Sequence, residues 1–175
     1  ACDVSSDLAE IARRRTADLT QIQVVEGDAV DAVRREGPFD LFFSRHGVMF
    51  FPEPVSAFRS FRSAANPGAS IVFSCFQSWE SNPWASGLAS AAAGTKLPAP
   101  GREPSGFAFA DPDYVREILG SSGWEPFEPT AVTFDYVAAT GDDVVSDALS
   151  FLGEIGPASR VVESMPEEQR GAAVE

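Results

Sequence analysis

The chain has 175 residues, a length that suits one domain with a single hydrophobic core. Apolar residues make up 44% and charged residues 22% of the sequence, which is typical of globular proteins and excludes a disordered chain. The formal net charge of -13 opposes binding to phosphate backbones, so nucleic acid is not an expected partner. No apolar run reaches the about 18 residues that cross a bilayer, so no membrane span is expected.

The two cysteines, Cys2 and Cys75, are too few for a disulfide framework. Each lies in a short apolar run, which is typical of a reduced structural thiol and predicts a cytoplasmic location. The sequence shows no charged segment followed by an apolar one, so no signal peptide is expected. The chain opens at Ala1-Cys2-Asp3 in the pattern of a strand end, and we therefore expect further sequence upstream of it.

Helices and strands are predicted to alternate along the first part of the chain. Ser5 is a predicted N-cap, and apolar residues at helical spacing follow it up to the arginines at 13–15. A β-branched run at residues 21–26 and an apolar run at residues 39–44 predict two strands, the second buried on both faces. A helix starting at Pro54 and a strand at residues 70–76 follow. This order predicts an α/β fold with a parallel sheet that has helices on both faces.

The second half of the chain breaks this alternation. Residues 77–110 are rich in small residues, prolines and glycines, and a segment of this length predicts a cap or substrate lid. Asp111-Pro112 is typical of a helix start, and residues 125–137 are predicted to form a strand that returns to the sheet. Residues 141–175 are predicted to form a C-terminal helical segment, with helices starting after Gly141 and at Gly156-Pro157.

Two aspartates follow predicted strands, where ligands of open α/β sheets bind. The carboxylate of Asp3 suits both ribose hydroxyls of a nucleoside, and the alternative is that it supports the turn into the Ser5 helix. The carboxylate of Asp28 suits an adenine amino group, and the Ala29 amide suits a ring nitrogen. The alternative for Asp28 is an Asx-turn or an N-cap for a short helix at residues 30–34.

A third candidate ligand-binding segment is residues 39–51, an apolar strand followed by a loop that ends at Phe51. Together these pieces resemble, in order and spacing, the ubiquinone/menaquinone-type class I S-adenosylmethionine-dependent methyltransferases, from residue 1 to about residue 165. The segments that carry the resemblance are Asp3-Val4-Ser5, the helix at 8–15, residues 25–29, residues 39–51, residues 57–68 and Asn82-Pro83-Trp84.

The resemblance implies a Rossmann-like, doubly wound methyltransferase sheet that is incomplete at both ends, with a cap inserted at residues 77–110. It implies methyl transfer from S-adenosylmethionine to a small-molecule acceptor, and no metal site is expected. The implied cofactor contacts are Asp3 at the ribose, Val4 on the adenine, Asp28 and Ala29 at the adenine edge, and Ser44 and Arg45 beside the methionine portion.

The reacting methyl group would lie near residues 46–51, and positioning of the acceptor supplies most of the catalysis. His46, the only histidine, is the candidate catalytic base, and the alternatives are a polar pocket wall or an exposed loop residue. Phe50, Trp79 and Trp84 are candidate substrate contacts. The alternative for the tryptophans is that they pack the cap onto the sheet.

The sequence departs from the family at its first strand and glycine-rich loop, because no Gly-x-Gly-x-Gly segment is present. We therefore expect the strand at residues 21–26 to be separate from the strand at residues 39–44. Two interpretations of the chain follow. It is part of a longer enzyme and does not methylate at a useful rate by itself, or it is an inactive subunit that associates through open strand edges. A nicotinamide-dependent oxidoreductase is a weaker alternative, because the only lysine, Lys96, lies in the predicted cap.

Overall fold

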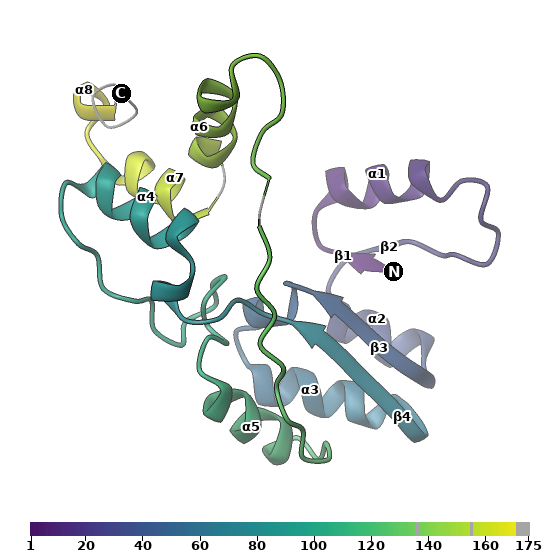
Figure 1. Ribbon diagram of the computed structural model, residues 1–175. Helices are drawn as coiled ribbons and strands as arrows, with labels where there is room; N and C mark the ends of the chain where they lie inside the picture. The colour runs from purple at the N-terminus through teal and green to yellow at the C-terminus, as the bar shows by residue number, and fades with distance from the viewer. Residues whose placement is uncertain (136, 155, 171–175) are drawn as a thin grey trace. The chain divides into compact units, whose positions relative to one another are not determined.

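The computed structural model describes residues 1–135, 137–154 and 156–170 of the chain (Figure 1). These residues form two compact units, which are described separately below. The first unit contains Ala1–Arg45, Glu53–Phe73 and Arg116–Pro126. The second contains His46–Pro52, Ser74–Val115 and the described residues from Phe127 onward.

The first unit begins with a small parallel sheet. Strand β1 (Cys2–Asp3) pairs with β2 (Val25–Glu26), with Asp3 opposite Glu26. Of the strand predicted at residues 21–26, only the last two residues are confirmed. Residues 21–24 lie outside a strand, although Val25 N donates to Ala1 O at 2.9 Å and the Ala1 amine donates to Gln23 O at 2.7 Å.

The two helices of this part of the first unit begin at side-chain caps. Helix α1 (Ser6–Arg15) follows Ser5, whose side chain accepts a hydrogen bond from Leu8 N, so the predicted N-cap is confirmed. Helix α2 (Ala29–Glu36) follows Asp28, whose side chain accepts hydrogen bonds from the next turn. Both caps satisfy backbone N–H groups that a helix start leaves without an intrahelical partner.

A second two-stranded sheet is formed by β3 (Phe39–Arg45) and β4 (Ala65–Ser74). Phe39 N donates to Ala64 O at the start of both strands, and His46 N donates to Ser74 O at their ends. The two strands are therefore parallel, as the arrows of Figure 1 show. The predicted separation of the 21–26 strand from the 39–44 strand is confirmed, because β2 and β3 belong to different sheets.

Helix α3 (Pro54–Ser63) starts at the predicted proline and packs its aromatic side chains on one face of this sheet (Figure 1). Phe58 is completely buried and Phe61 is 5% exposed. Aromatic contacts hold the layers together and make this the core of the first unit. The ring centroid distances are 5.6 Å for Phe42–Phe61, 5.5 Å for Phe58–Phe73 and 5.9 Å for Phe42–Trp124.

The other face of the β3–β4 sheet is open, so the prediction that residues 39–44 are buried on both faces was wrong. Leu41 is 58% exposed, Phe43 is 74% exposed and Val72 on β4 is 52% exposed. Side chains alternate along a strand, so Leu41 and Phe43 point away from the face on which Phe42 meets Phe61. The helices of the first unit leave these apolar side chains uncovered.

The second unit is mainly helical and has its own core. Helix α4 (Pro83–Ala93) packs against α7 (Gly156–Ser164), as Figure 1 shows. A 3-10 helix, η2 (Trp79–Ser81), precedes α4, so the segment at residues 77–110, predicted as a helical and loop cap insertion, contains helical structure. The buried side chains of this core are Trp79, Ala85, Ala89 and Phe107.

The predicted helix starts in the C-terminal half are confirmed, but one predicted strand is not. Helix α5 (Pro112–Ser121) follows Asp111, and α6 (Val144–Glu154) follows Gly141. A short helix, α8 (Glu167–Arg170), ends the described chain. The strand predicted at residues 125–137 was wrong for its described residues, 125–135 and 137, which are irregular.

The physical reason for this correction is the absence of a neighbouring strand. Val132 is 66% exposed and Phe134 is 65% exposed, and neither two-stranded sheet of the described chain includes this segment. The preference of such residues for strands depends on packing against a neighbouring strand, so the local pattern alone does not produce one. None of the described helices has the length and apolar composition required to cross a membrane.

The core of the first unit makes a stability prediction. Replacement of buried Phe58 by Ala removes its contacts with Phe61 and Phe73 and is expected to lower the free energy of unfolding by about 3–5 kcal/mol. The matched control is Phe43→Ala on the open face, which is expected to change this free energy by about 0.5 kcal/mol or less. Urea denaturation followed by tryptophan fluorescence measures both, and equal effects would contradict the described packing.

Candidate functional site

Asp3 and Asp28 lie together at the carboxyl ends of two neighbouring parallel strands. Asp3 ends β1, and Asp28 lies two residues beyond the end of β2. The Gly27 amide between them donates to Asp3 O at 2.9 Å, and Gly27 has φ of 141°, a conformation that suits glycine. The structure thus confirms that both acids lie at adjacent strand ends, as the sequence predicted.

Both carboxylates have a local structural role. Oδ1 of Asp3 accepts a hydrogen bond from Ser5 N at 2.9 Å. Oδ1 of Asp28 accepts from Val30 N at 2.7 Å and from Asp31 N at 3.2 Å, which makes Asp28 the N-cap of α2. The structural alternatives for both residues are therefore confirmed. A cofactor role stays a prediction and would have to coexist with these bonds.

The remaining polar groups at these strand ends can serve a ligand. Within the part of the chain that the structure describes, the second oxygen, Oδ2, of Asp3 and of Asp28 makes no hydrogen bond. The N–H of Ala29 lies in the first turn of α2, where amides have no intrahelical partner. The apolar side chain of Val4 is 75% exposed beside them. The group thus offers two acceptors, one donor and an apolar surface.

Ser44 and Arg45, the other predicted cofactor contacts, lie at the carboxyl end of β3. Ser44 is partly buried and Arg45 is exposed. Strand pairing does not join β3 to the sheet that carries Asp3, since the described strands form two separate pairs. The structure therefore groups the predicted nucleoside contacts in one place and leaves Ser44 and Arg45 on a separate sheet.

His46, the predicted base, belongs to the second unit and makes both backbone and ring contacts there. Its backbone has φ of 55°, which is uncommon for a residue other than glycine. Its N–H donates to Ser74 O at 3.1 Å, and its ring stacks on Phe76 with centroids 4.3 Å apart. The sequence did not single out Phe76, although its position just beyond β4 was a signal that it lies near a strand end.

The predicted substrate contacts Trp79 and Trp84 belong to an aromatic cluster of the second unit. Trp79 is 5% exposed and packs edge-to-face on Phe107, with ring centroids 5.0 Å apart. The ring centroid of Trp84 lies 5.3 Å from that of Phe76, the residue that stacks on His46. Burial of Trp79 agrees with the packing alternative, whereas Phe50 in the 3-10 helix η1 (Val48–Phe50) is 46% exposed.

Both cysteines are free, and the surroundings of each favour the protonated thiol over the thiolate. Burial, together with the nearby charges of Asp28 and Asp3, raises the pKa of the Cys2 thiol. Burial raises the pKa of the Cys75 thiol. A raised pKa lowers the thiolate fraction near neutral pH, so neither thiol has the electrostatics of an activated nucleophile. Among residues 1–135, 137–154 and 156–170, no three metal-ligating side chains form a group that could hold a metal ion.

Comparison with known proteins identifies the class to which the first part of the chain is similar. A family model described as a methyltransferase domain matches residues 1–73, the segment that contains Asp3, Asp28 and the β3–β4 sheet up to Phe73. The resemblance to class I methyltransferases that the sequence predicted is confirmed over this segment.

Particular relatives are demethylmenaquinone methyltransferases of two staphylococci. The Staphylococcus epidermidis protein is 30% identical over 70 residues, which are 40% of this chain and 29% of the relative. The Staphylococcus saprophyticus protein is 29% identical over 70 residues, which are 40% of this chain and 30% of the relative. The match thus spans less than a third of these relatives. No solved structure matches the chain significantly.

The N-cap role of Asp28 can be measured directly. Replacement of Asp28 by Ala removes the acceptor for two amides of α2 and is expected to lower the free energy of unfolding by about 1 kcal/mol. Asp28→Ser keeps a capping oxygen and is the matched control. It is expected to lower the free energy of unfolding by only about a few tenths of a kcal/mol. Urea denaturation of the two variants would contradict the capping role if both were equally stable.

The raised pKa of Cys75 predicts slow alkylation. In a Cys2→Ser background at pH 8, iodoacetamide is expected to modify Cys75 about tenfold or more slowly than a free cysteine peptide, because burial disfavours the thiolate. The rate is expected to approach that of the peptide when urea unfolds the chain. If the folded chain reacts as fast as the peptide, the thiol of Cys75 is not buried and its pKa is not raised.

Proposed function

We propose that this chain is part of an S-adenosylmethionine-dependent methyltransferase that acts on a small-molecule acceptor. The observation that carries the proposal is the pair formed by Asp3 and Asp28 at adjacent strand ends, within the segment that matches a methyltransferase domain. Each carboxylate keeps its Oδ2 atom available after its structural hydrogen bonds. The proposed acceptor is a small molecule, in keeping with the similar demethylmenaquinone methyltransferases.

The residues at the ends of β1 and β2 are proposed to bind the nucleoside half of the cofactor. Asp3 would accept hydrogen bonds from the ribose hydroxyls, and exposed Val4 would pack on the adenine. Asp28 would accept from the adenine amino group, and the first-turn amide of Ala29 would donate to a ring nitrogen. Ser44 and Arg45 are proposed to lie beside the methionine portion. When bound, S-adenosylmethionine supplies an electrophilic methyl group to the acceptor.

The residues of the second unit are proposed to serve the acceptor. His46 would take a proton from an acceptor hydroxyl or enol, with its ring held by stacking on Phe76. Phe50 and Trp84 would line the acceptor pocket, and buried Trp79 would contribute by holding Phe107 in place. Residues 77–110 would act as the cap, and residues 141–175 as the C-terminal helical segment of a single methyltransferase domain.

The overall architecture proposed for the complete domain is a doubly wound, Rossmann-like parallel sheet. Two observations support it: both described strand pairs are parallel, and α3 covers one face of the β3–β4 pair. Parallel strands of this kind normally have both faces covered. A reducing, cytoplasmic location is part of the same proposal and is supported by the two free cysteines.

A second candidate function is that of an inactive methyltransferase-like subunit that binds a partner through open strand edges. The observation in its favour is the structure of the sheets, since each described sheet has only two strands and the β3–β4 sheet exposes Leu41, Phe43 and Val72. Unpaired edges are templates for further strand pairing. This candidate predicts association of the chain without cofactor binding.

Nuclear magnetic resonance titrations with adenosine and with S-adenosylmethionine test the proposal. Both ligands are expected to shift the amides of Val4 and Ala29 saturably and with similar affinity, because the fitted contacts belong to the nucleoside they share. Asp28→Ser keeps the N-cap but lacks the carboxylate, and it is expected to weaken both affinities about 5- to 150-fold.

The matched control is Asp18→Ala, which removes an exposed carboxylate in the turn after α1. This variant is expected to bind both ligands as the unmodified chain does. Absence of saturable binding, or unchanged affinity in Asp28→Ser, would contradict the nucleoside site. Concentration-dependent association in the absence of binding would favour the partner-binding subunit.

A further inference from the structure

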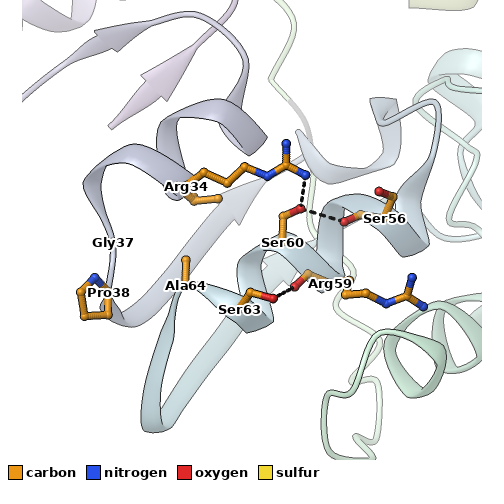
Figure 2. Close-up of a pocket in the computed structure, with 9 residues that line it drawn as sticks. Arg34, Gly37, Pro38, Ser56, Arg59, Ser60, Ser63 and Ala64 are labelled. Atoms are coloured by element: carbon orange, nitrogen blue, oxygen red, sulfur yellow. Dashed lines mark hydrogen bonds between the residues drawn. The ribbon is translucent and has the colours of Figure 1, made fainter.

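The first unit contains a groove between α2 and α3 that has no part in the proposed nucleoside site. Its volume is about 580 Å³, within the roughly 300–1,000 Å³ typical of small-molecule sites. Figure 2 shows that Arg34 on α2 and Ser56, Ser60 and Ser63 on α3 line it. Pro38, which precedes β3, also lines the groove.

The charge of the groove is opposite to that of the chain as a whole. The sequence has 26 acidic and 13 basic residues, yet the groove is lined by two arginines, Arg34 and Arg59, and by no acidic residue. Arg34 Nη1 lies 3.9 Å from Oδ1 of Asp31, in an exposed ion pair of the kind that contributes little to stability. The lining is thus locally cationic in an acidic protein.

A buried serine holds Arg34 in position over the groove. Nη2 of Arg34 donates to Ser60 Oγ at 2.9 Å, and Ser60 Oγ donates to the carbonyl oxygen of Ser56 at 3.0 Å (Figure 2). Ser60 is 8% exposed, so the serine end of this relay is buried. The Arg34 side chain itself is 60% exposed, and a guanidinium group has five N–H donors. The relay fixes one edge of the guanidinium and leaves other donors accessible.

Arg59 contributes charge to the opposite wall. Figure 2 shows its side chain directed away from Arg34, and its Nη2 donates to Ser121 O, at the end of α5, at 2.9 Å. Ser56, Arg59, Ser60 and Ser63 follow helical spacing, so they lie along one face of α3, where the serines line the groove and the Arg59 guanidinium extends toward α5. Ser60 Oγ and Ser63 Oγ both donate to backbone carbonyls of α3, so the guanidinium of Arg34 is the main hydrogen-bond donor available to an anion in the groove.

We propose that the groove binds an oxyanion, a phosphate or carboxylate group carried by a small organic molecule, with Arg34 as its main ligand. A guanidinium fork matches the oxygen spacing of both groups, and the groove is larger than the anion alone requires. Pro38 lies at the amino end of β3 and Ser44 near its carboxyl end, about 20 Å apart in an extended strand. The groove lining includes none of the proposed cofactor contacts, and its Pro38 end lies far from Ser44, so the proposed oxyanion site does not depend on the proposed function.

Titration of the full chain with sodium phosphate and with sodium acetate, at constant ionic strength set with sodium chloride, tests the site. Amide and Arg Nε–Hε resonances in ¹H–¹⁵N spectra are expected to shift saturably at Arg34, Ser56 and Ser60. Arg34→Gln is expected to raise the dissociation constant about fivefold or more. The matched control is Arg14→Gln, at an exposed position on α1. This variant is expected to keep the dissociation constant within about twofold of that of the unmodified chain.

Arg34→Lys serves as a second variant if Arg34→Gln does not fold, because it keeps the charge and loses the fork. It is expected to bind either anion more weakly than the unmodified chain. A stronger response to phosphate identifies a phosphate group as the ligand, and a stronger response to acetate identifies a carboxylate; both support the site. Shifts that rise linearly with concentration, or equal binding by Arg34→Gln and the unmodified chain, would show that Arg34 and Ser60 only link α2 to α3.

Discussion

The parallel pairing of β1 with β2 is the constraint on which the functional account depends. Parallel strands end at the same edge of a sheet, so pairing of Asp3 with Glu26 places Asp28 next to the end of β1. Gly27, with its positive φ, lets the chain turn there and form the N-cap of α2. The side chains of Asp3, Val4 and Asp28 and the amide of Ala29 thus lie close together, although they come from two separate segments of the chain. Loss of this pairing would separate them without altering any of their chemistry.

The same carboxylates serve the fold and are available to a ligand. Asp28 holds the first turn of α2 through Oδ1 alone, and Asp3 holds the turn into α1 in the same way. A carboxylate has about four lone-pair sites, so a structural hydrogen bond does not exclude a ligand. The nucleoside contacts would therefore be positioned before binding by bonds that already exist in the protein, which reduces the ordering that binding requires.

Local signals allowed the sequence to predict helix starts and the two acids, whereas features that depend on distant partners were missed. Ser5 and Pro54 mark helix starts because capping and the fixed φ of proline act within one turn. The burial of Phe43 was predicted wrongly because it depends on a layer that the described part of the first unit does not provide. The Arg34–Ser60 bond joins residues 26 positions apart, and no spacing rule connects them.

The central claim is that a nucleoside binds at the ends of β1 and β2, and an isotope-filtered nuclear Overhauser experiment tests it most directly. With adenosine bound to the labelled chain, the account predicts contacts from the adenine protons to the Val4 methyl groups, and from the ribose protons to residues adjoining Asp3. Contacts only to residues outside β1, β2 and the first turn of α2, or none under conditions where adenosine is bound, would contradict it.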